Sequence, residues 1–315
     1  MLKVGVIGLG AMGNNHARVY SELPDTELVG VADLDSELAR GIAKKYNTVP
    51  FADYKELLRQ GLDAVSIAVP TSLHREIAVH VACAGVNILV EKPIADTVEA
   101  AREMIKSARD NTVKLMVGHI ERFNPIIPIL KKEIEGAEVI LIEITRIGPF
   151  PPRVKDVGIV VDLAVHDIDL IRYLTGSDLK EIYSLISKSR SKHEDAAIML
   201  FRMANGVIAR CTINWLTPFK VREISIATNK KFIRASLIEQ KISEYSTYTE
   251  SDHYLVKEFS VPFGEPLKFE LEAFIDSVIN DTEPPVTGFD GLEALKRAIQ
   301  CLNLDTVVES NPTNI

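Results

Sequence analysis

Three side chains capable of acid–base chemistry interrupt an otherwise apolar stretch. Residues 160–174 read VVDLAVHDIDLIRYL, in which Asp162, His166 and Asp169 stand among valine, leucine and isoleucine. Residues three and four apart stack on one face of a helix, so these three are expected to share one stripe, with Asp167 to its side. Burying an acid or an imidazole is unfavourable unless the group is paired. The stripe is therefore either a self-satisfied polar network or the wall of a cleft, and these residues alone favour the network.

A second feature with chemical potential lies at the N-terminus, where glycines follow an apolar segment. Gly8, Gly10 and Gly13 in VGVIGLGAMGNNHA have the spacing GxGxxG, and the next apolar segment, ELVGVAD, ends at Asp33. This order is typical of a dinucleotide-binding βαβ unit. The glycines would allow a tight turn, let the backbone approach a pyrophosphate and let the helix pack closely. A glycine turn without a nucleotide is the alternative, and the strand and helix around it favour the nucleotide.

Asp33 favours NAD over NADP. Its carboxylate would accept hydrogen bonds from ribose hydroxyls and would repel a 2′-phosphate. The next residues, Leu34 and Asp35, supply no basic group to hold such a phosphate. The alternative is that Asp33 serves only as a turn residue.

Lys92 directly follows a buried strand, in the sequence EKP. Ligands of an open parallel sheet lie beyond the carboxyl ends of its strands, so this ammonium is expected near the nicotinamide. Pro93 favours an extended backbone at Lys92. A solvated loop lysine paired with Glu91 is an equal alternative on spacing alone. The residues predicted to contact the cofactor are Gly8, Gly10, Ala11, Met12, Gly13, Asp33, Val69, Pro70, Thr71, His74, Glu91 and Lys92.

The elements that must position these residues differ between the two halves of the chain. Up to about residue 118, short apolar segments alternate with amphipathic helical patterns, which predicts a doubly wound parallel sheet. The predicted strands are Lys3 to Leu9, Glu27 to Asp33, Asp63 to Val69, Asn87 to Val90 and Lys114 to Gly118. The predicted helices are Met12 to Leu23, Ser36 to Tyr46, Tyr54 to Gln60, Ser72 to Ala84 and Thr97 to Arg109; the roles of His16, His74 and His80 in them stay open.

In the second half, successive strand patterns run from Glu181 to about Val261 without intervening helices, and two helices, Leu267 to Ile279 and Leu292 to Val308, close the chain. This pattern predicts an α+β domain with an open, mostly antiparallel sheet. We therefore expect an α/β protein with a Rossmann domain over residues 1–120 and a substrate-binding and oligomerisation domain over residues 121–315. A large sheet covered on one side only favours a homo-oligomer, a dimer or tetramer, through its other face.

Charge and composition exclude several classes of function. The 315 residues contain 36 basic and 44 acidic side chains, for a net charge of −8, which disfavours a general role on nucleic acid or a membrane surface. The cysteines, Cys83, Cys211 and Cys301, are odd in number and widely spaced, so neither a disulfide framework nor a CxxC metal site is indicated. No secretory signal or membrane-spanning segment is recognisable. We expect a cytoplasmic protein without a metal site.

The motifs GLGAMGNNHA, EKP and DLAVHDIDLIRYL, in this order and at these separations, resemble the glucose-fructose oxidoreductase, inositol dehydrogenase and MocA family over essentially the whole chain. The resemblance implies NAD(P)-dependent oxidation of a sugar or cyclitol hydroxyl. It further implies that Lys92, Asp162 and His166 form the catalytic set. In such proteins the bond between Lys92 and Pro93 is often cis, and the open sheet commonly forms the oligomer interface.

Two further stretches, MVGHIERFNP and RIGPFPPRVKDVGIVVDLAVHDIDLI, look most like the members of that family that oxidise UDP-N-acetylglucosamine at carbon 3. In an acidic protein, ITRIGPFPPRVK carries only basic charge and could bind a diphosphate, although a solvated loop is an equal alternative. Asn124 could otherwise cap the following helix. The predicted substrate contacts are Lys92, His119, Arg122, Asn124, Arg146, Arg153, Lys155, Asp162, His166 and Asp169.

The resulting hypothesis assigns a role to each catalytic residue. His166 would remove the hydroxyl proton, Asp162 would orient the imidazole, and Lys92 would stabilise negative charge on the same oxygen. The residues do not decide which of Lys92 and His166 is the base. An aminotransferase that consumes the 3-keto product is an expected functional partner. The alternatives are another sugar or inositol as substrate, or a regulator that senses a dinucleotide without turnover, against which the presence of Lys92 and His166 argues.

Overall fold

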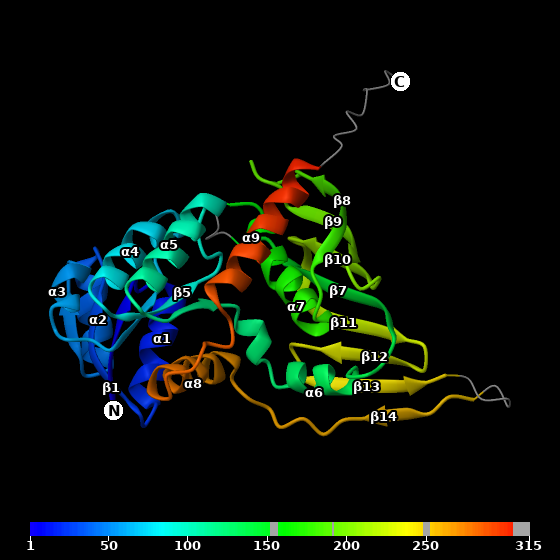
Figure 1. The fold of residues 1–315 in the computed structure, drawn as a ribbon, viewed down its shortest axis with the longest axis horizontal. Coiled ribbons are helices and arrows are strands. Elements are labelled where there is room, and N and C mark those ends of the chain that lie inside the picture. Colours follow the sequence, from blue (N-terminus) through cyan, green and yellow to red (C-terminus); the bar gives the residue numbers. More distant parts are fainter. Residues whose placement is uncertain (152–156, 191, 248–252, 305–315) are drawn as a thin grey trace, which may run out of the picture. The chain divides into compact units, whose positions relative to one another are not determined.

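The fold is described from a computed structural model, which covers residues 1–151, 157–190, 192–247 and 253–304. The chain forms two compact units (Figure 1). The first comprises Met1–Asn124 and Gly264–Leu295, and the second comprises Pro125–Phe263 and the residues from Lys296 onward. The predicted boundary at residue 120 lies close to the first change of unit. A single boundary does not capture the segment 264–295, which returns to the first unit.

The first unit contains a six-stranded sheet in the order β3-β2-β1-β4-β5-β6, with every pair parallel. The inner strands β4 and β5 are short apolar runs that are buried along nearly their whole length, as expected of a sheet covered on both faces. The predicted doubly wound sheet is thus confirmed. The strands are β1 (Leu2–Ile7), β2 (Thr26–Ala32), β3 (Val49–Phe51), β4 (Ala64–Ile67), β5 (Asn87–Glu91) and β6 (Leu115–Gly118).

Three helices of the first unit, α2, α3 and α5, begin at a side chain that accepts hydrogen bonds from backbone amides. Asp35 accepts from two amides at the start of α2, Asp53 from one at the start of α3, and Thr97 from one at the start of α5. Such caps satisfy amides that have no partner inside the helix. The helices are α1 (Ala11–Glu22), α2 (Ser36–Lys45), α3 (Tyr54–Leu58), α4 (His74–Cys83), α5 (Val98–Asp110) and α8 (Pro266–Ile279), with short 3₁₀ turns η1 (Thr71–Leu73) and η2 (Ile120–Phe123).

The second unit is built on an eight-stranded sheet in the order β14-β13-β12-β11-β7-β10-β9-β8. All its neighbours are antiparallel except β7 and β10, which are parallel, so the prediction of a mostly antiparallel sheet is confirmed. The strands are β7 (Val139–Pro149), β8 (Leu179–Ser187), β9 (Ala196–Met203), β10 (Ile208–Asn214), β11 (Leu216–Thr228), β12 (Lys231–Ser236), β13 (Lys241–Ser246) and β14 (Val256–Glu258).

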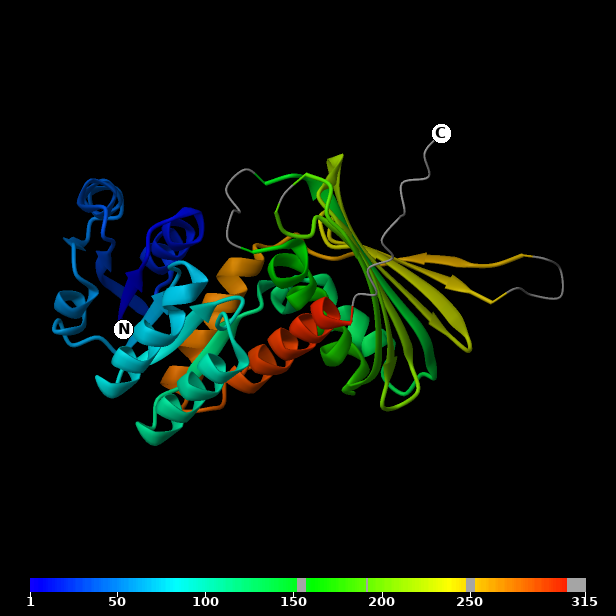
Figure 2. The same ribbon diagram turned by 90° about the horizontal axis from the view of Figure 1, so that it is seen from above.

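One face of this sheet forms the core of the second unit. Alternate residues of β9 and β10, such as Met199 and Cys211, belong to one buried apolar cluster with residues of α6 (Ile126–Glu133) and α7 (Val165–Thr175). Figure 2 shows the sheet nearly edge-on, with the green helices of the same unit on one side. The residues between the buried ones face the other side and are exposed, which is the alternation expected of a sheet with one covered face.

Two expectations from the whole chain can be compared with the structure. All three cysteines are free thiols, with Cys211 and Cys301 buried and Cys83 exposed, so no disulfide framework is present. Within the described ranges, the helices are too short or too polar to span a bilayer. The last helix, α9 (Gly288–Asn303), begins earlier than predicted, and its predicted end lies outside the described residues.

Candidate functional site

The glycine turn between β1 and α1 requires glycine at two of its three positions. Gly8 has a φ of +86°, and a Cβ atom there would lie 2.7 Å from the backbone of Ala68. A Cβ on Gly13 would lie 1.8 Å from the carbonyl oxygen of Gly8, so only glycine lets α1 pack this closely on the turn. A Cβ on Gly10 would meet nothing within 4 Å. The turn therefore leaves room in front of the helix N-terminus, where amide hydrogens attract a phosphate.

A glycine-to-alanine pair tests this geometry. We expect Gly13→Ala to displace α1 and to weaken NAD binding by about tenfold or more, because the pyrophosphate contact depends on the turn. Gly41→Ala is the matched control: Gly41 lies within α2, a Cβ on it would meet nothing within 4 Å, and its replacement should stabilise the fold by about 0.5–1 kcal/mol. Calorimetric titration with NAD and urea denaturation measure both effects. Equal NAD affinity in the two variants would contradict the assigned role of Gly13.

Asp33 lies directly after β2 and holds two backbone segments. Its carboxylate accepts hydrogen bonds from the amide of Leu9, at 2.7 Å, and from the amide of Asp35, at 2.9 Å. Asp33 thus acts as a turn residue through its bond with Asp35, and it holds the glycine turn in place through its bond with Leu9. Each carboxylate oxygen has more than one lone pair, so these bonds leave Asp33 able to accept from a ribose hydroxyl as well.

His74 joins the loops that follow β4 and β5. Its Nε2 lies 3.0 Å from the carbonyl oxygen of Val69, and its Nδ1 lies 3.0 Å from that of Pro93. Burial lowers the pKa of His74, although the backbone carbonyls and Glu91 oppose that shift. Val69, Pro70, Thr71 and His74 therefore lie at the carboxyl end of the sheet. His74 links the loop that follows β4 to the loop that follows β5.

Lys92 follows β5, as predicted, and the peptide bond between Lys92 and Pro93 is cis. Its amide donates a hydrogen bond of 3.2 Å to Glu91 Oε2. The other oxygen of Glu91 lies 3.0 Å from His16 Nε2. Burial alone would raise the pKa of Glu91, but the bond with His16 and the charge of Lys92 outweigh it and hold that pKa below its usual range.

The predicted substrate contacts of the first unit follow β6. His119 is buried at the carboxyl end of this strand. Arg122 forms an ion pair of 3.1 Å with Asp290 and donates a hydrogen bond to the carbonyl of Pro285, both within the first unit. Burial would raise the pKa of Asp290, but the charge of Arg122 holds it below its usual range. Asn124 is buried and directly precedes Pro125, the N-cap residue of α6.

Arg146 differs from the expectation of an exposed loop cation. It lies on β7, is only 2 % exposed, and its Nε donates a hydrogen bond of 2.8 Å to Asp167 Oδ1. Asp167, the acid that stood beside the predicted stripe, is fully buried in α7. The two residues thus form an ion pair within the core of the second unit. Arg153 and Lys155, the other basic residues predicted to bind a diphosphate, lie outside the described residues.

The helix that carries Asp162 and His166 is not regular. Residues Val160–Ala164 form a π-helical turn, η3, which continues into α7. A π turn holds more residues per turn than an α-helix, so the regular α-helix expected for residues 160–174 begins with a wider turn over Val160–Ala164. Such turns occur frequently at functional sites. Asp162 is half-buried, whereas His166 and Asp169 are buried.

Glu194 fixes the start of this turn and was not foreseen from the sequence. Its carbonyl oxygen accepts from the amide of Ile159 at 3.0 Å, and its Oε1 accepts from the amide of Val160 at 3.2 Å. Gly158 permits this contact, because a Cβ there would lie 1.9 Å from Glu194 Oε1. The only sequence signal was a pair of acids, Glu194 and Asp195, directly before an apolar strand.

The parallel sheet and the glycine turn are those of a dinucleotide-binding domain. Residues 2–119 match the family model described as an oxidoreductase family with an NAD-binding Rossmann fold, and residues 138–234 match the GFO/IDH/MocA C-terminal domain. An inositol 2-dehydrogenase of Rhizobium meliloti is 31% identical over 94% of both chains. The protein belongs to the Gfo/Idh/MocA family, and its cofactor is NAD.

Two further proteins to which the chain is similar are sugar dehydrogenases. The UDP-N-acetylglucosamine 3-dehydrogenase of Acidithiobacillus ferrooxidans is 28% identical over 95% of this chain and 96% of its own. Its solved structure has a TM-score of 0.91 at 27% identity and covers 96% of this chain. A levoglucosan dehydrogenase solved with NADH and levoglucosan has a TM-score of 0.87 at 21% identity over 96% of both chains, which shows a common fold.

Proposed function

We propose that the protein oxidises a secondary hydroxyl of a sugar with NAD, and that its substrate is UDP-N-acetylglucosamine, converted to the 3-keto derivative. The observation that supports this most is the similarity to the UDP-N-acetylglucosamine 3-dehydrogenase of Acidithiobacillus ferrooxidans, which extends over nearly the whole of both chains. The glycine turn, with its open space at Gly10, suits the pyrophosphate of NAD. When bound, NAD accepts the hydride from the sugar carbon.

Three side chains carry the proton chemistry in this proposal. His166 removes the hydroxyl proton, because the ordinary pKa of histidine is near neutral. Asp162 orients the imidazole of His166 and favours its charged form. Lys92 donates a hydrogen bond to the reacting oxygen and stabilises its negative charge. Asp169 contacts the substrate or His166.

Two of the proposed substrate contacts already have a charged partner. Arg122 and Arg146 already form ion pairs with acids of their own units, so their guanidinium groups have partners before any diphosphate binds. Arg153 and Lys155 remain the proposed diphosphate ligands. His119 and Asn124 are proposed to contact the sugar. The ion pair of Arg146 makes it the weakest member of this set.

Product analysis tests the proposed substrate. The protein is incubated with NAD and a panel of nucleotide sugars, free sugars and inositols, and the products are identified by mass spectrometry. We expect NADH and a 3-keto product from UDP-N-acetylglucosamine. Because the equilibrium of such an oxidation is unfavourable, an aminotransferase that consumes the ketone is added in a second arm. A ketone at another position, or turnover of free inositol alone, would refute the substrate.

A second candidate substrate class is supported by the relatives themselves. Inositol dehydrogenases match this chain at a similar identity, including the one of Rhizobium meliloti at 31%. The inositols in the panel therefore decide between the two. NAD binding without turnover of any compound would favour a non-enzymatic, dinucleotide-sensing regulator instead.

We further propose that the chain forms a homo-oligomer, a dimer or tetramer, through the open face of the eight-stranded sheet. Four apolar side chains face outward on β8 and β9: Leu185 lies opposite Ile198, and Tyr183 lies opposite Leu200. Each is between 45% and 63% exposed. A contiguous apolar patch of this kind is typical of a protein interface.

A lysine introduced into this patch should weaken the association. We expect Ile198→Lys to shift the oligomer towards smaller species, with an association constant reduced by about tenfold or more, because a charge would be buried unpaired. Ile279→Lys is the matched control, since Ile279 ends α8 in the first unit and is similarly exposed, at 51% against 48% for Ile198. Sedimentation velocity measures both variants. A monomeric parent protein would refute the proposed interface.

A further inference from the structure

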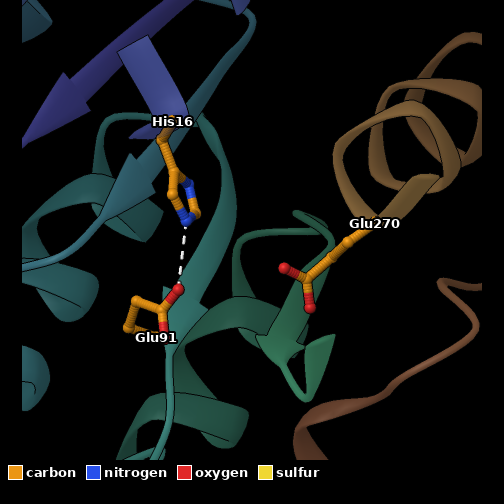
Figure 3. A group of neighbouring side chains, drawn as sticks. All are labelled: His16, Glu91 and Glu270. Atoms are coloured by element: carbon orange, nitrogen blue, oxygen red, sulfur yellow. Dashed lines mark hydrogen bonds and ion pairs between the residues drawn. The ribbon is translucent and has the colours of Figure 1, made fainter. Parts of the chain in front are cut away.

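Three titratable side chains from distant parts of the sequence meet inside the first unit. His16 of α1, Glu91 of β5 and Glu270 of α8 each direct one polar atom into the same space, and these atoms all lie within 4.8 Å of one another (Figure 3). His16 and Glu270 are fully buried, and Glu91 is 8 % exposed. One of the three, Glu91, directly precedes Lys92 in the sequence.

A hydrogen-bonded chain leads from α1 to the backbone of Lys92. The hydroxyl of Tyr20 lies 2.8 Å from Ser66 Oγ, which lies 3.0 Å from His16 Nδ1. His16 Nε2 lies 3.0 Å from Glu91 Oε1, and Glu91 Oε2 accepts the amide hydrogen of Lys92. Both oxygens of Glu91 are thus engaged, one by a helix and one by the residue that follows. This arrangement fixes the position of the Lys92 backbone.

Glu270 lies beside this chain without joining it. Within the described part of the structure, neither of its carboxyl oxygens has a hydrogen-bond partner. The titratable groups that face it are His16 and Tyr20 on α1, Glu91 on β5 and Glu121 on η2. Burial, and then the negative charges of Glu91 and Glu121, raise the pKa of Glu270 well above its usual range. The pKa values of two neighbouring carboxyls are therefore shifted in opposite directions, down for Glu91 and up for Glu270.

A histidine and two glutamates could also bind a divalent cation. The geometry favours a proton between His16 and Glu91 instead. His16 Nε2 can bind Glu91 through a proton or a cation through its lone pair, but it cannot do both. Its separation of 3.0 Å from Glu91 Oε1 is that of a direct hydrogen bond. A neutral Glu270 also avoids placing a second negative charge beside Glu91 in a fully buried space.

We propose that Glu270 is a proton-holding acid, which stays neutral beside Glu91 so that Glu91 keeps the negative charge with which it positions Lys92. Glu91 and Glu270 are thus positioning residues that act through Lys92. This inference rests on the proposed function for the catalytic role of Lys92, but the protonation of Glu270 can be measured without any substrate.

The protonation of Glu270 is tested by infrared spectroscopy and by stability as a function of pH. The difference spectrum at neutral pH between the parent and Glu270→Gln should contain the C=O stretching band of a neutral carboxylic acid. A proton held only in the folded state also makes unfolding more favourable as pH rises above the unfolded pKa of glutamate and up to the raised folded one. We therefore expect the unfolding constant of the parent to rise by about tenfold per pH unit relative to Glu270→Gln.

Glu272→Gln is the matched control for these measurements. Glu272 lies on the same helix as Glu270, but its side chain is 39% exposed and faces Lys268. This variant should lack the infrared difference band and should follow the parent's dependence on pH. A missing band in Glu270→Gln, or parallel stability curves for it and the parent, would overturn the proposal for Glu270. So would a stoichiometric divalent metal in the purified protein that Glu270→Gln fails to retain.

The positioning role is tested by a double-mutant cycle on turnover. Glu91→Gln should lower kcat by about tenfold or more in the parent, and it should lower kcat no further once Lys92 is replaced by alanine. Equal effects of Glu91→Gln in both backgrounds would show that Glu91 does not act through Lys92 and would overturn this part of the proposal. Absence of turnover in the parent would count against the proposed function, whereas the infrared and pH results would still decide the state of Glu270.

Discussion

Replacing Lys92 or His166 by alanine should lower kcat by about 10²- to 10⁴-fold in each case, with the affinity for NAD nearly unchanged. The lysine change removes the hydrogen-bond donor that stabilises negative charge on the reacting oxygen. The histidine change removes the group that takes the hydroxyl proton. A loss of this size in kcat, without a matching loss in cofactor binding, is typical of a group that acts mainly on the transition state.

Steady-state kinetics on the substrate found by product analysis, together with calorimetric titration of NAD, measure these effects. Two matched variants control for the loss of a side chain of the same type. Lys44→Ala removes an exposed lysine from α2, and His80→Ala removes a histidine from α4 whose Nδ1 contacts Tyr54. Both should retain kcat within a few-fold of the parent. Turnover of Lys92→Ala and His166→Ala within that same range would refute the mechanism.

The pH dependence of these variants also decides which residue is the base. If His166 is the base, the acidic limb of the kcat profile should disappear in a residual-activity measurement on His166→Ala and persist in Lys92→Ala. The sequence could not settle this point, because two interacting groups titrate as a pair.

The Rossmann half of the fold could be predicted closely because its signals are local. A strand buried on both faces is a continuous apolar run, and some helices between such strands begin at a capping side chain, as α2 does at Asp35 and α5 at Thr97. The strand β3 was missed because it has only three residues, Val49–Phe51, one of which is proline. A short edge strand leaves too few residues for a pattern to appear.

The features that could not be predicted depend on contacts between distant residues. The parallel pairing of β7 with β10 and the return of residues 264–295 to the first unit have no local signal. Likewise, the first amide of the π turn at Val160–Ala164 donates a hydrogen bond to the carboxylate of Glu194, which is far from it in sequence. Periodicity assumes a regular helix and cannot detect a bond of this kind.

In the candidate site, too, local features could be predicted and contacts between distant residues could not. The glycine turn could be predicted from spacing, because one of its close contacts, between Gly13 and the carbonyl oxygen of Gly8, joins neighbours in sequence. The other, between Gly8 and Ala68, joins distant residues and has no local signal. Arg146 was interpreted as a cation facing the substrate because it stands near prolines and other basic residues. Its partner, Asp167, had already appeared as the one acid that did not fit the helical stripe. A misplaced acid and a misplaced base in the same unit were a joint signal of a buried ion pair.

That ion pair leads to the second large prediction. Asp167→Ala should destabilise the second unit by about 3–5 kcal/mol, because it leaves the guanidinium of Arg146 buried without its counter-charge. The total stability of a domain is about 5–15 kcal/mol, so a loss of this size removes a large part of it. The single tryptophan, Trp215, is buried in the second unit and reports its unfolding by fluorescence in urea.

Two variants separate the buried charge from other effects of Asp167→Ala. Asp178→Ala makes the same change in an ion pair with Arg172, 2.8 Å away, whose aspartate is 60% exposed, and it should cost at most about 1 kcal/mol because solvent screens that carboxylate. The double variant Arg146→Met with Asp167→Leu removes both charges and fills the space with apolar atoms. It should recover much of the stability lost in Asp167→Ala, since an ion pair in a core is often no more stable than a well-packed apolar pair. If the double variant were as unstable as the single one, the loss would come from packing around Asp167, and the charge of Arg146 would not be its cause.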